Sequence, residues 1–275
     1  MCPPAYYGIE YEINPWMKCS RPSNYQLAQQ QWDALYQILS DQLGVQVSLI
    51  EPRPGLPDMV FTANAGFVWE NKFIPSNFRH DARRGEVTYF QEWFTSRNYE
   101  IVKLSEHHYF EGEGDLLVCA DIVFAGYPYR SSASAHRGVA EIIQRKVQSL
   151  RLISHWFYHL DTCFCPLSAT EAIYYPAAFY SDALEILKEY IDTLIPVTED
   201  EARRFACNAI VIGKNVIINH GCPQICRRLE SLEFSVFETP LTEFIKAGGS
   251  AKCLVLKIPY LHNAPPSSQN RLPAA

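Results

Sequence analysis

The amino-acid sequence predicts an α/β propeller with five-fold pseudosymmetry, built from modules of two strands, a helix and a strand. The first observation is a repeat: short apolar hairpins recur along the chain, each headed by a polar residue or a cysteine. These hairpin heads lie 45 to 51 residues apart and are Asn64, Asp115, Asp161, Asn208 and Cys253. A fixed period in this range is typical of propellers and solenoids. The second observation is that a helix-period segment and a short apolar run follow the hairpins, so that about five units fit the chain.

The elements can be justified in order from local sequence. A helix is expected over residues 25–43, because Ser23 and Asn24 are both favourable N-caps, and a strand over 45–50 follows it. Further helices are expected where apolar residues recur on one face, over residues 84–97, 136–150 and 181–193. Each module then returns through a short strand, expected over 100–104, 152–159, 194–197 and 234–237.

The fifth module has to be completed by the two ends of the chain. We expect a strand over residues 8–14 to pair beside a strand that opens at Cys253, because closure hides the free edges of the sheets. A single domain over residues 1–262 is therefore predicted. The tail over 263–275 is rich in proline and serine and is expected to be disordered.

Composition and charge limit the class of protein. The chain has 275 residues, 48% of them hydrophobic, which is enough to bury a sizeable core. A net charge of −6 argues against nucleic acid or an anionic membrane as partner and is compatible with a cationic small molecule. No signal peptide or bilayer-spanning run is evident, so the nine cysteines are interpreted as reduced thiols in the cytoplasm. A homo-oligomer is left open.

Equivalent positions of a radial array face one axis, so the hairpin heads should meet at one end of a central channel. Carboxylates and amides around a thiol would suit a planar guanidinium cation, which presents five donors in a fixed fork. Cys253 follows the glycine pair Gly248 and Gly249, and a thiol held at the start of a strand suits a nucleophile. The alternative for Cys253 alone is a small buried thiol of the core.

Four motifs on this frame resemble a known group of enzymes. They are Leu-Pro-Asp-Met-Val-Phe-Thr-Ala-Asn over 56–64, Glu-Gly-Glu-Gly-Asp over 111–115, His-Leu-Asp over 159–161 and Gly-Gly-Ser-Ala-Lys-Cys over 248–253. Together they are similar to the guanidine-modifying enzymes of the pentein fold, which include arginine deiminases, dimethylarginine hydrolases and amidinotransferases. The opening residues 7–17 resemble the arginine dihydrolase branch known from cyanobacteria, and the resemblance covers about residues 5–260.

The resemblance implies a catalytic set. Cys253 would attack the guanidinium carbon and form a covalent intermediate, and His159 would protonate the leaving ammonia and then activate water. Glu111 would hold His159 and the guanidinium in register. Glu113 is an alternative, because Glu-Gly-Glu-Gly-Asp departs from the usual Glu-Gly-Gly-Asp, and Asp115 is expected to lie behind the site.

The resemblance also implies a substrate-binding set. Asp161 would bind guanidinium nitrogens, and Arg130 resembles the arginine that grips the substrate carboxylate. Arg83 is a second candidate for that carboxylate, the alternative being a solvated charge at a helix start. Asp58 would contact substrate unless it is only a turn residue after Pro57. Neither a metal nor an organic cofactor is expected, because the sequence has no phosphate loop, dinucleotide fingerprint or complete zinc ligand set.

The reaction product depends on Asn64. Deiminases of this fold commonly carry aspartate at this position. The arginine and succinylarginine dihydrolases, which the chain resembles, carry asparagine. An amide, unlike a carboxylate, can donate to the carbonyl oxygen of a ureido group, so Asn64, with Asn14 opposite it, could retain that group for a second attack. The expected reaction is arginine plus two waters giving ornithine, carbon dioxide and two ammonia. The alternatives are deimination that stops at citrulline and, more distantly, a non-catalytic pentein that serves as a binding surface.

Overall fold

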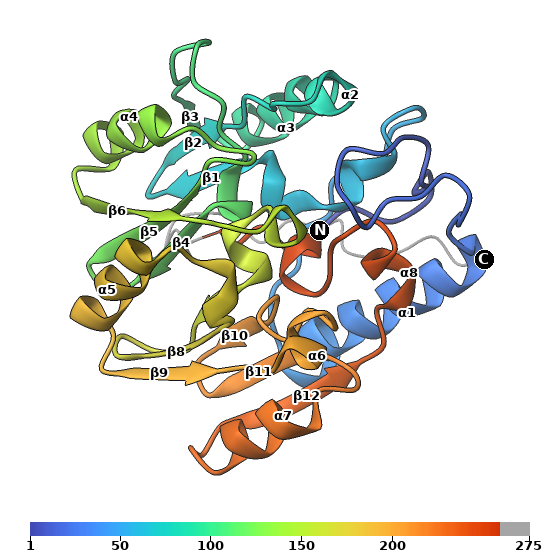
Figure 1. Cartoon of the computed structure of the whole chain (residues 1–275). Helices are drawn as coiled ribbons and strands as arrows, with labels where there is room; N and C mark the ends of the chain where they lie inside the picture. Colours follow the sequence, from blue (N-terminus) through green and yellow to red (C-terminus); the bar gives the residue numbers. More distant parts are fainter. Residues whose placement is uncertain (259–275) are drawn as a thin grey trace.

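Four three-stranded sheets surround a common axis in the computed structural model of the chain (Figure 1), which describes residues 1–258. The expected domain end at 262 and the expected tail over 263–275 lie outside the described residues. Each sheet consists of three strands consecutive in sequence. The strands are β1 (Gly66–Trp69), β2 (Lys72–Pro75) and β3 (Glu100–Ile101); β4 (Leu116–Cys119), β5 (Ile122–Tyr127) and β6 (Lys146–Arg151); β7 (Phe164–Pro166), β8 (Glu171–Tyr174) and β9 (Thr193–Pro196); β10 (Ile210–Ile212), β11 (Asn215–Asn219) and β12 (Ser235–Thr239).

The four sheets share one topology, which confirms the predicted module of two strands, a helix and a strand. In every sheet the first two strands form an antiparallel hairpin and the third pairs parallel to the second. The crossover helices are α3 (Glu86–Thr95), α4 (Ala133–Ile143), α5 (Ser181–Tyr190) and α7 (Pro223–Glu230), and they lie on the outside of the molecule in Figure 1. Short helices α2 (Asp81–Arg84), α6 (Glu199–Ala202) and α8 (Thr242–Ile245) occupy the connections.

The helix expected over 25–43 is confirmed as α1 (Tyr25–Gln37), capped by the side chain of Asn24 and continued by a π-helical turn, Ile38–Gln42. The helix expected over 136–150 is too long. It ends at Ile143 because Gln144 adopts a left-handed conformation with φ of 52°, and β6 follows immediately. The strand expected over 152–159 is therefore wrong, and a 3-10 turn, His155–Phe157, occupies part of it.

The fifth module is where the predicted strands fail. No strand is assigned over residues 8–14, 45–50 or 253–258 of the described chain. Cys253 lies instead in a 3-10 turn, Lys252–Leu254, because the side chain of Asn208 accepts the backbone N–H groups of Ser250 and Cys253. The chain ends still meet, since the Tyr7 hydroxyl donates to the carbonyl of Glu243 at 2.8 Å.

The outer helices are held to the sheets by apolar packing. On α3, for example, Phe94 stacks on Phe73 of β2 with ring centroids 3.9 Å apart, and both rings are buried. All nine cysteines are free thiols, and only Cys19 is exposed. Within residues 1–258, no helix has the length and apolar character needed to cross a bilayer. The helices and sheets thus form a tightly packed outer layer. The polar side chains at the axis are positioned by the turns that precede the hairpins.

Candidate active site

The hairpin heads lie on short turns around the axis. Asn64 and Asp161 sit within the 3-10 turns Thr62–Ala65 and Leu160–Thr162, and Asp115 directly follows the 3-10 turn Gly112–Gly114. The turn that carries Asn64 contacts both the Gly112–Gly114 turn and the turn of Cys253. The predicted convergence of these positions is therefore present, although Cys253 belongs to a turn and not to a strand.

The sulfur of Cys253 lies between a carboxyl group and an amide. The thiol donates to Oδ2 of Asp161 at 3.3 Å and accepts from Nδ2 of Asn208 at 3.2 Å. Burial, followed by the negative charge of Asp161, raises the pKa of the Cys253 thiol well above its ordinary value. Burial also raises the pKa of Asp161 to about 7, with the Lys252 ammonium opposing this rise. In the absence of a bound substrate cation, the Cys253 thiol and the Asp161 carboxyl group therefore keep protons that have to leave before the sulfur can attack.

Glu111 contacts His159, as the resemblance implies, and also Arg130, a contact that was not predicted. Its Oε2 lies 2.8 Å from Nε2 of His159 and 3.0 Å from Nη1 of Arg130. Burial alone would raise the pKa of Glu111, but the charges of Arg130 and His159 prevail, and the pKa is lowered well below its ordinary value. Glu111 is thus an ionised acceptor that orients the imidazole ring.

The alternative partner for the histidine, Glu113, is engaged elsewhere. Its Oε2 accepts from Nζ of Lys252 at 2.7 Å and from the backbone N–H of Lys257 at 3.1 Å. Asp115 lies behind the site, where its carboxylate accepts the backbone N–H groups of Ser131 and Leu160. The two residues therefore support the turns around the axis, and Glu111 is the carboxylate beside His159.

Arg83 is not a solvated charge at a helix start, so that interpretation is wrong. The side chain is 3% exposed and forms a two-pronged pair with Glu86 at 2.8 and 2.9 Å. Its Nη1 donates to Oδ1 of Asn64 at 2.8 Å, and its Nη2 donates to the carbonyl of Asp58 at 3.0 Å. Because a guanidinium can only donate, this contact identifies the oxygen of the Asn64 amide. Nδ2 of Asn64 is buried and has no hydrogen-bond partner among residues 1–258.

A small cavity of about 10 Å³ lies beside the Cys253 sulfur. This volume holds roughly one water molecule, so arginine requires movement of the wall. Six of the nine predicted site residues line the cavity, and the other three contact lining residues. The lining is Ile13, Asn14, Met17, Asp58, Phe61, Asn64, Arg83, Arg130, Tyr158, Ala247, Gly249 and Cys253.

One wall of this cavity is the N-terminal segment over residues 13–17. The carbonyl of Ile13 accepts from Nη2 of Arg130 at 3.0 Å, and Nδ2 of Asn14 donates to the carbonyl of Ala247 at 3.0 Å. Oδ1 of Asn14 accepts the backbone N–H groups of Trp16 and Met17. Packing holds the segment as well, because Trp16 contacts the rings of Trp156 and Phe205 and Met17 is buried.

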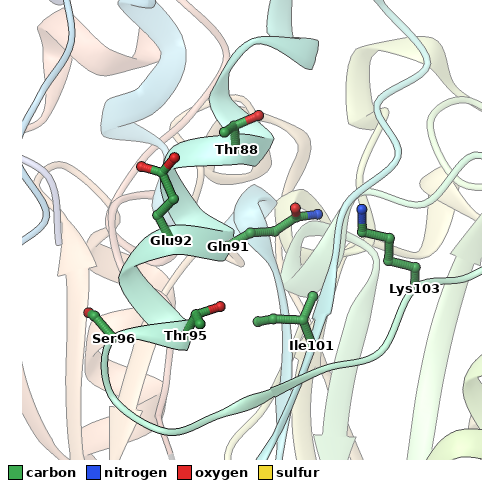
Figure 2. Close-up of a pocket in the computed structure, with 7 residues that line it drawn as sticks. All are labelled: Thr88, Gln91, Glu92, Thr95, Ser96, Ile101 and Lys103. Carbon is green, nitrogen blue, oxygen red and sulfur yellow. The ribbon is translucent and has the colours of Figure 1, made fainter.

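A much larger hollow on the surface has a different character (Figure 2). It is open to solvent and lies along α3 and β3, lined by Thr88, Gln91, Glu92, Thr95, Ser96, Ile101 and Lys103. It shares no residue with the cavity at Cys253, and Glu92 and Lys103 are its only charged side chains. None of the nine predicted site residues lines this hollow.

Two residues of the site, Tyr158 and Lys252, were not predicted, and a third, Asn208, was expected at the axis but without a role. The hydroxyl of Tyr158 donates to the carbonyl of Gly248 at 2.7 Å, and its ring lies under the guanidinium of Arg130. Lys252 forms a buried ion pair with Glu113, and Asn208 contacts the nucleophile. A signal existed only for Asn208, because the repeat placed it among the hairpin heads.

The chain is similar to a known protein family and to several named proteins. A family model described as N,N dimethylarginine dimethylhydrolase, eukaryotic, matches residues 10–260. The chain is 43% identical over 263 residues to the bifunctional arginine dihydrolase/ornithine cyclodeaminase AgrE of Nostoc sp., a match that covers 94% of this chain and 37% of AgrE. It is 39% identical to the N(G),N(G)-dimethylarginine dimethylaminohydrolase of Mycobacterium tuberculosis, with 94% of this chain and 84% of that protein covered.

A solved structure shows the same architecture. The N-terminal domain of ArgZ, an arginine dihydrolase from the ornithine-ammonia cycle in Cyanobacteria, bound to product, superposes with a TM-score of 0.88 at 41% identity, covering 92% of this chain and 94% of that domain. The chain spans a little over a third of the length of the bifunctional relative AgrE. The matched family model and these relatives show that the chain belongs to the N,N-dimethylarginine dimethylhydrolase family of guanidine-modifying penteins, and the frame of four like sheets agrees with this.

Proposed function

We propose that this domain, over residues 1–262, hydrolyses arginine to ornithine, carbon dioxide and two ammonia through covalent intermediates on Cys253. The observation that carries the proposal is the Asn64 amide. Its oxygen is occupied by Arg83, while its buried nitrogen has no partner among the described residues. The relatives named arginine dihydrolases support the same substrate.

In this proposal, the guanidinium cation binds against Asp161 and Cys253. Oδ1 of Asp161 is buried without a partner in the described chain and is available to a guanidinium N–H. A cation beside both groups lowers the pKa of the thiol and of the carboxyl group, so binding itself releases the protons. The substrate thereby generates the thiolate that attacks it.

The first hydrolysis uses His159 twice. The Cys253 thiolate attacks the guanidinium carbon, and the C–N bond breaks as the imidazolium, held by Glu111, gives its proton to the departing ammonia. The neutral imidazole then takes a proton from water, hydroxide attacks the same carbon, and the C–S bond breaks. The result is a neutral ureido group in the cavity and a regenerated thiolate.

The second hydrolysis depends on Asn64. Nδ2 of Asn64 donates to the ureido oxygen and keeps the carbon in reach of the thiolate. A second attack releases the second ammonia and leaves a thiocarbamate, whose hydrolysis frees the carbamate of ornithine, and this loses carbon dioxide. We assign Arg83 to the orientation of Asn64, which differs from the carboxylate contact expected from the sequence.

The remaining contacts fix the amino-acid end of the substrate. Arg130 already donates to Glu111 and to the carbonyl of Ile13, and a substrate carboxylate would replace the carbonyl. Asp58 has a buried carboxylate oxygen without a partner among residues 1–258 and is available to the α-amino group. Asn14 closes the cavity over the reacting carbon. We further infer a cytoplasmic location, which the nine free thiols support.

Product analysis with arginine tests the proposal. Ammonia and ornithine in a ratio near two, without lasting citrulline, is the expected result. Citrulline that accumulates in an amount equal to ammonia would establish deimination instead. Absence of turnover in the wild type would favour a non-catalytic pentein, whereas turnover that Cys253→Ser abolishes would exclude it. Turnover unchanged in Cys253→Ser would refute Cys253 as the nucleophile.

A further inference from the structure

A second amide contacts the nucleophile directly. Asn208 is fully buried and heads the fourth hairpin. Its Nδ2 lies 3.2 Å from the sulfur of Cys253 and 3.0 Å from the carbonyl of Asp161. Its Oδ1 accepts the backbone N–H of Ser250 at 3.1 Å and of Cys253 at 3.2 Å. Every polar contact of this side chain is therefore to the turn of the nucleophile or to the turn of Asp161.

The orientation of this amide is unambiguous. The two backbone N–H groups can only donate, so the atom that faces them has to be the oxygen. The carbonyl of Asp161 can only accept, so the atom that faces it has to be the nitrogen. The sulfur of Cys253 consequently faces an N–H donor and not a carbonyl oxygen.

We propose that Asn208 is a catalytic residue that stabilises the Cys253 thiolate and holds its sulfur in position for attack. The inference deepens the proposed function, because it rests on Cys253 as the nucleophile. A hydrogen bond donated to an anion is stronger than one to a neutral acceptor, so this contact favours the charged form of the sulfur. It opposes the effect of Asp161, whose carboxylate also contacts this sulfur and raises the pKa of the thiol.

The acceptor half of the amide has a separate task. The Oδ1 atom of Asn208 accepts two backbone N–H groups of the turn. The backbone carbonyl of Asn208 accepts a third, from Lys252, at 3.1 Å. These hydrogen bonds fix the backbone that carries the sulfur. Asn208→Asp keeps an oxygen for these N–H groups and removes the donor to the sulfur. The substitution also places a carboxylate beside the sulfur, so both changes disfavour the thiolate while the contacts that position the backbone are kept.

Asn219 offers a matched control. It is also buried, and its Nδ2 donates to the carbonyls of Arg204 and His220 while its Oδ1 accepts the backbone N–H of Leu241. It has no contact with Cys253 among the described residues. Asn219→Asp thus removes the same donors and adds the same charge in a comparably buried place, away from the nucleophile.

The test measures the alkylation rate of Cys253 by iodoacetamide across pH 7 to 10, with the labelled peptide identified by mass spectrometry. At a pH below the thiol pKa, the ratio of two rates equals the ratio of thiolate fractions. We expect Asn208→Asp to lower the rate at pH 7.5 by about tenfold or more, as a rise of one pKa unit implies. Asn219→Asp should alkylate like the wild type, even if it melts at a lower temperature.

Equal rates for Asn208→Asp and the wild type would overturn the proposal, as would an equal loss in Asn219→Asp. If Asn208→Asp does not fold, Asn208→Ser, which retains an oxygen too short to reach the sulfur, is judged by the same criterion. Alkylation requires no turnover. A wild type that does not hydrolyse arginine would refute the proposed function, whereas unchanged alkylation would refute only the role of Asn208.

Discussion

At the scale of single residues, the site is controlled by which way its amides point. Arg83 turns the oxygen of Asn64 away from the reacting groups, and two backbone N–H groups do the same for Asn208. The Nδ2 atoms of both amides therefore point toward the reacting groups. A donor at Asn64 suits a neutral carbonyl oxygen, while a donor at Asn208 suits a sulfur anion.

Replacing Asn64 by aspartate should change the product. A carboxylate binds the guanidinium cation more strongly but repels the oxygen of a ureido group, so the second hydrolysis should fail. We expect Asn64→Asp to release citrulline and one ammonia per arginine, measured by amino-acid analysis. Asn77→Asp, an amide that bonds to backbone carbonyls near His108 and is not a cavity residue, should still release ornithine.

Binding of arginine should release protons. Because the pKa of Asp161 is raised to about 7, much of this carboxyl group is protonated at pH 6.5, and a bound guanidinium would ionise it. Calorimetric titration of Cys253→Ser with arginine, in two buffers of different ionisation enthalpy, should show a substantial fraction of one proton released. The same titration of a Cys253→Ser, Asp161→Asn double variant should show much less, and equal release would contradict the assignment to Asp161.

At the scale of elements, the turns at the axis pack so closely that only glycine fits between two of them. A Cβ atom on Gly114 would lie 2.4 Å from Nδ2 of Asn64 and 3.1 Å from the His159 ring. The Gly112–Gly114 turn thereby sets the spacing between the amide and the imidazole. This spacing cannot be read from either residue alone.

Gly114→Ala should therefore cost activity more than stability. The added methyl group displaces Asn64 or His159, and a misplacement of about 1 Å lowers rates by on the order of 100-fold. Steady-state kcat with arginine, compared with thermal unfolding, measures the two effects. Gly8→Ala is the control, because a Cβ atom there makes only ordinary contacts at 3.8 Å. An unchanged kcat in Gly114→Ala would show that the turn tolerates the shift.

Local pattern predicted the four complete modules because their alternation, period and turn residues are encoded within about 50 residues. It failed where a distant side chain replaces a sheet hydrogen bond. The side chain of Asn208, 45 residues away in sequence, accepts the backbone N–H of Cys253. The apolar segment that begins at Cys253 therefore starts with a turn and not with the strand that its sequence predicts. α4 ends early, before Gln144, and the sequence has no glycine there that would predict this end.

The same contrast holds for the site. The positions of Cys253, Asp161 and Asn64 follow from the repeat, whereas Glu111 and His159 were identified through resemblance to a family. The ion pair of Lys252 with Glu113 joins residues 139 positions apart, and no local pattern predicts it. Arg83 was assigned to the substrate carboxylate because its partners Glu86 and Asn64 emerge only in three dimensions.

At the scale of the whole molecule, several buried carboxyl groups remain protonated at a higher pH than they would in the unfolded chain. Burial raises the pKa of Asp115 to about 6 and those of Glu86 and Asp161 to about 7. The folded state holds these protons at pH values where the unfolded chain has released them. The stability that they contribute is therefore lost as the pH rises from about 4 through 7.

The free energy of unfolding should consequently fall between pH 6 and pH 8. Asp161 alone accounts for about 1 kcal/mol of that fall, given its folded pKa and the ordinary value for an aspartate. Urea unfolding at the two pH values measures it. Asp161→Asn should show a smaller fall than the wild type, and an identical fall would contradict the assignment.

The enclosure of the cavity beside Cys253 has a kinetic consequence. The wall formed by residues 13–17 has to move to admit arginine, and once it closes again it keeps the ureido intermediate from diffusing away before it reacts. The bound ureido species can either leave the site or undergo the second hydrolysis, and closure of the wall favours the second hydrolysis. Arginine labelled at its guanidinium carbon, turned over in excess unlabelled citrulline, should give carbon dioxide that retains the label undiluted. Dilution of the label would mean that each round begins from a fresh encounter with solution.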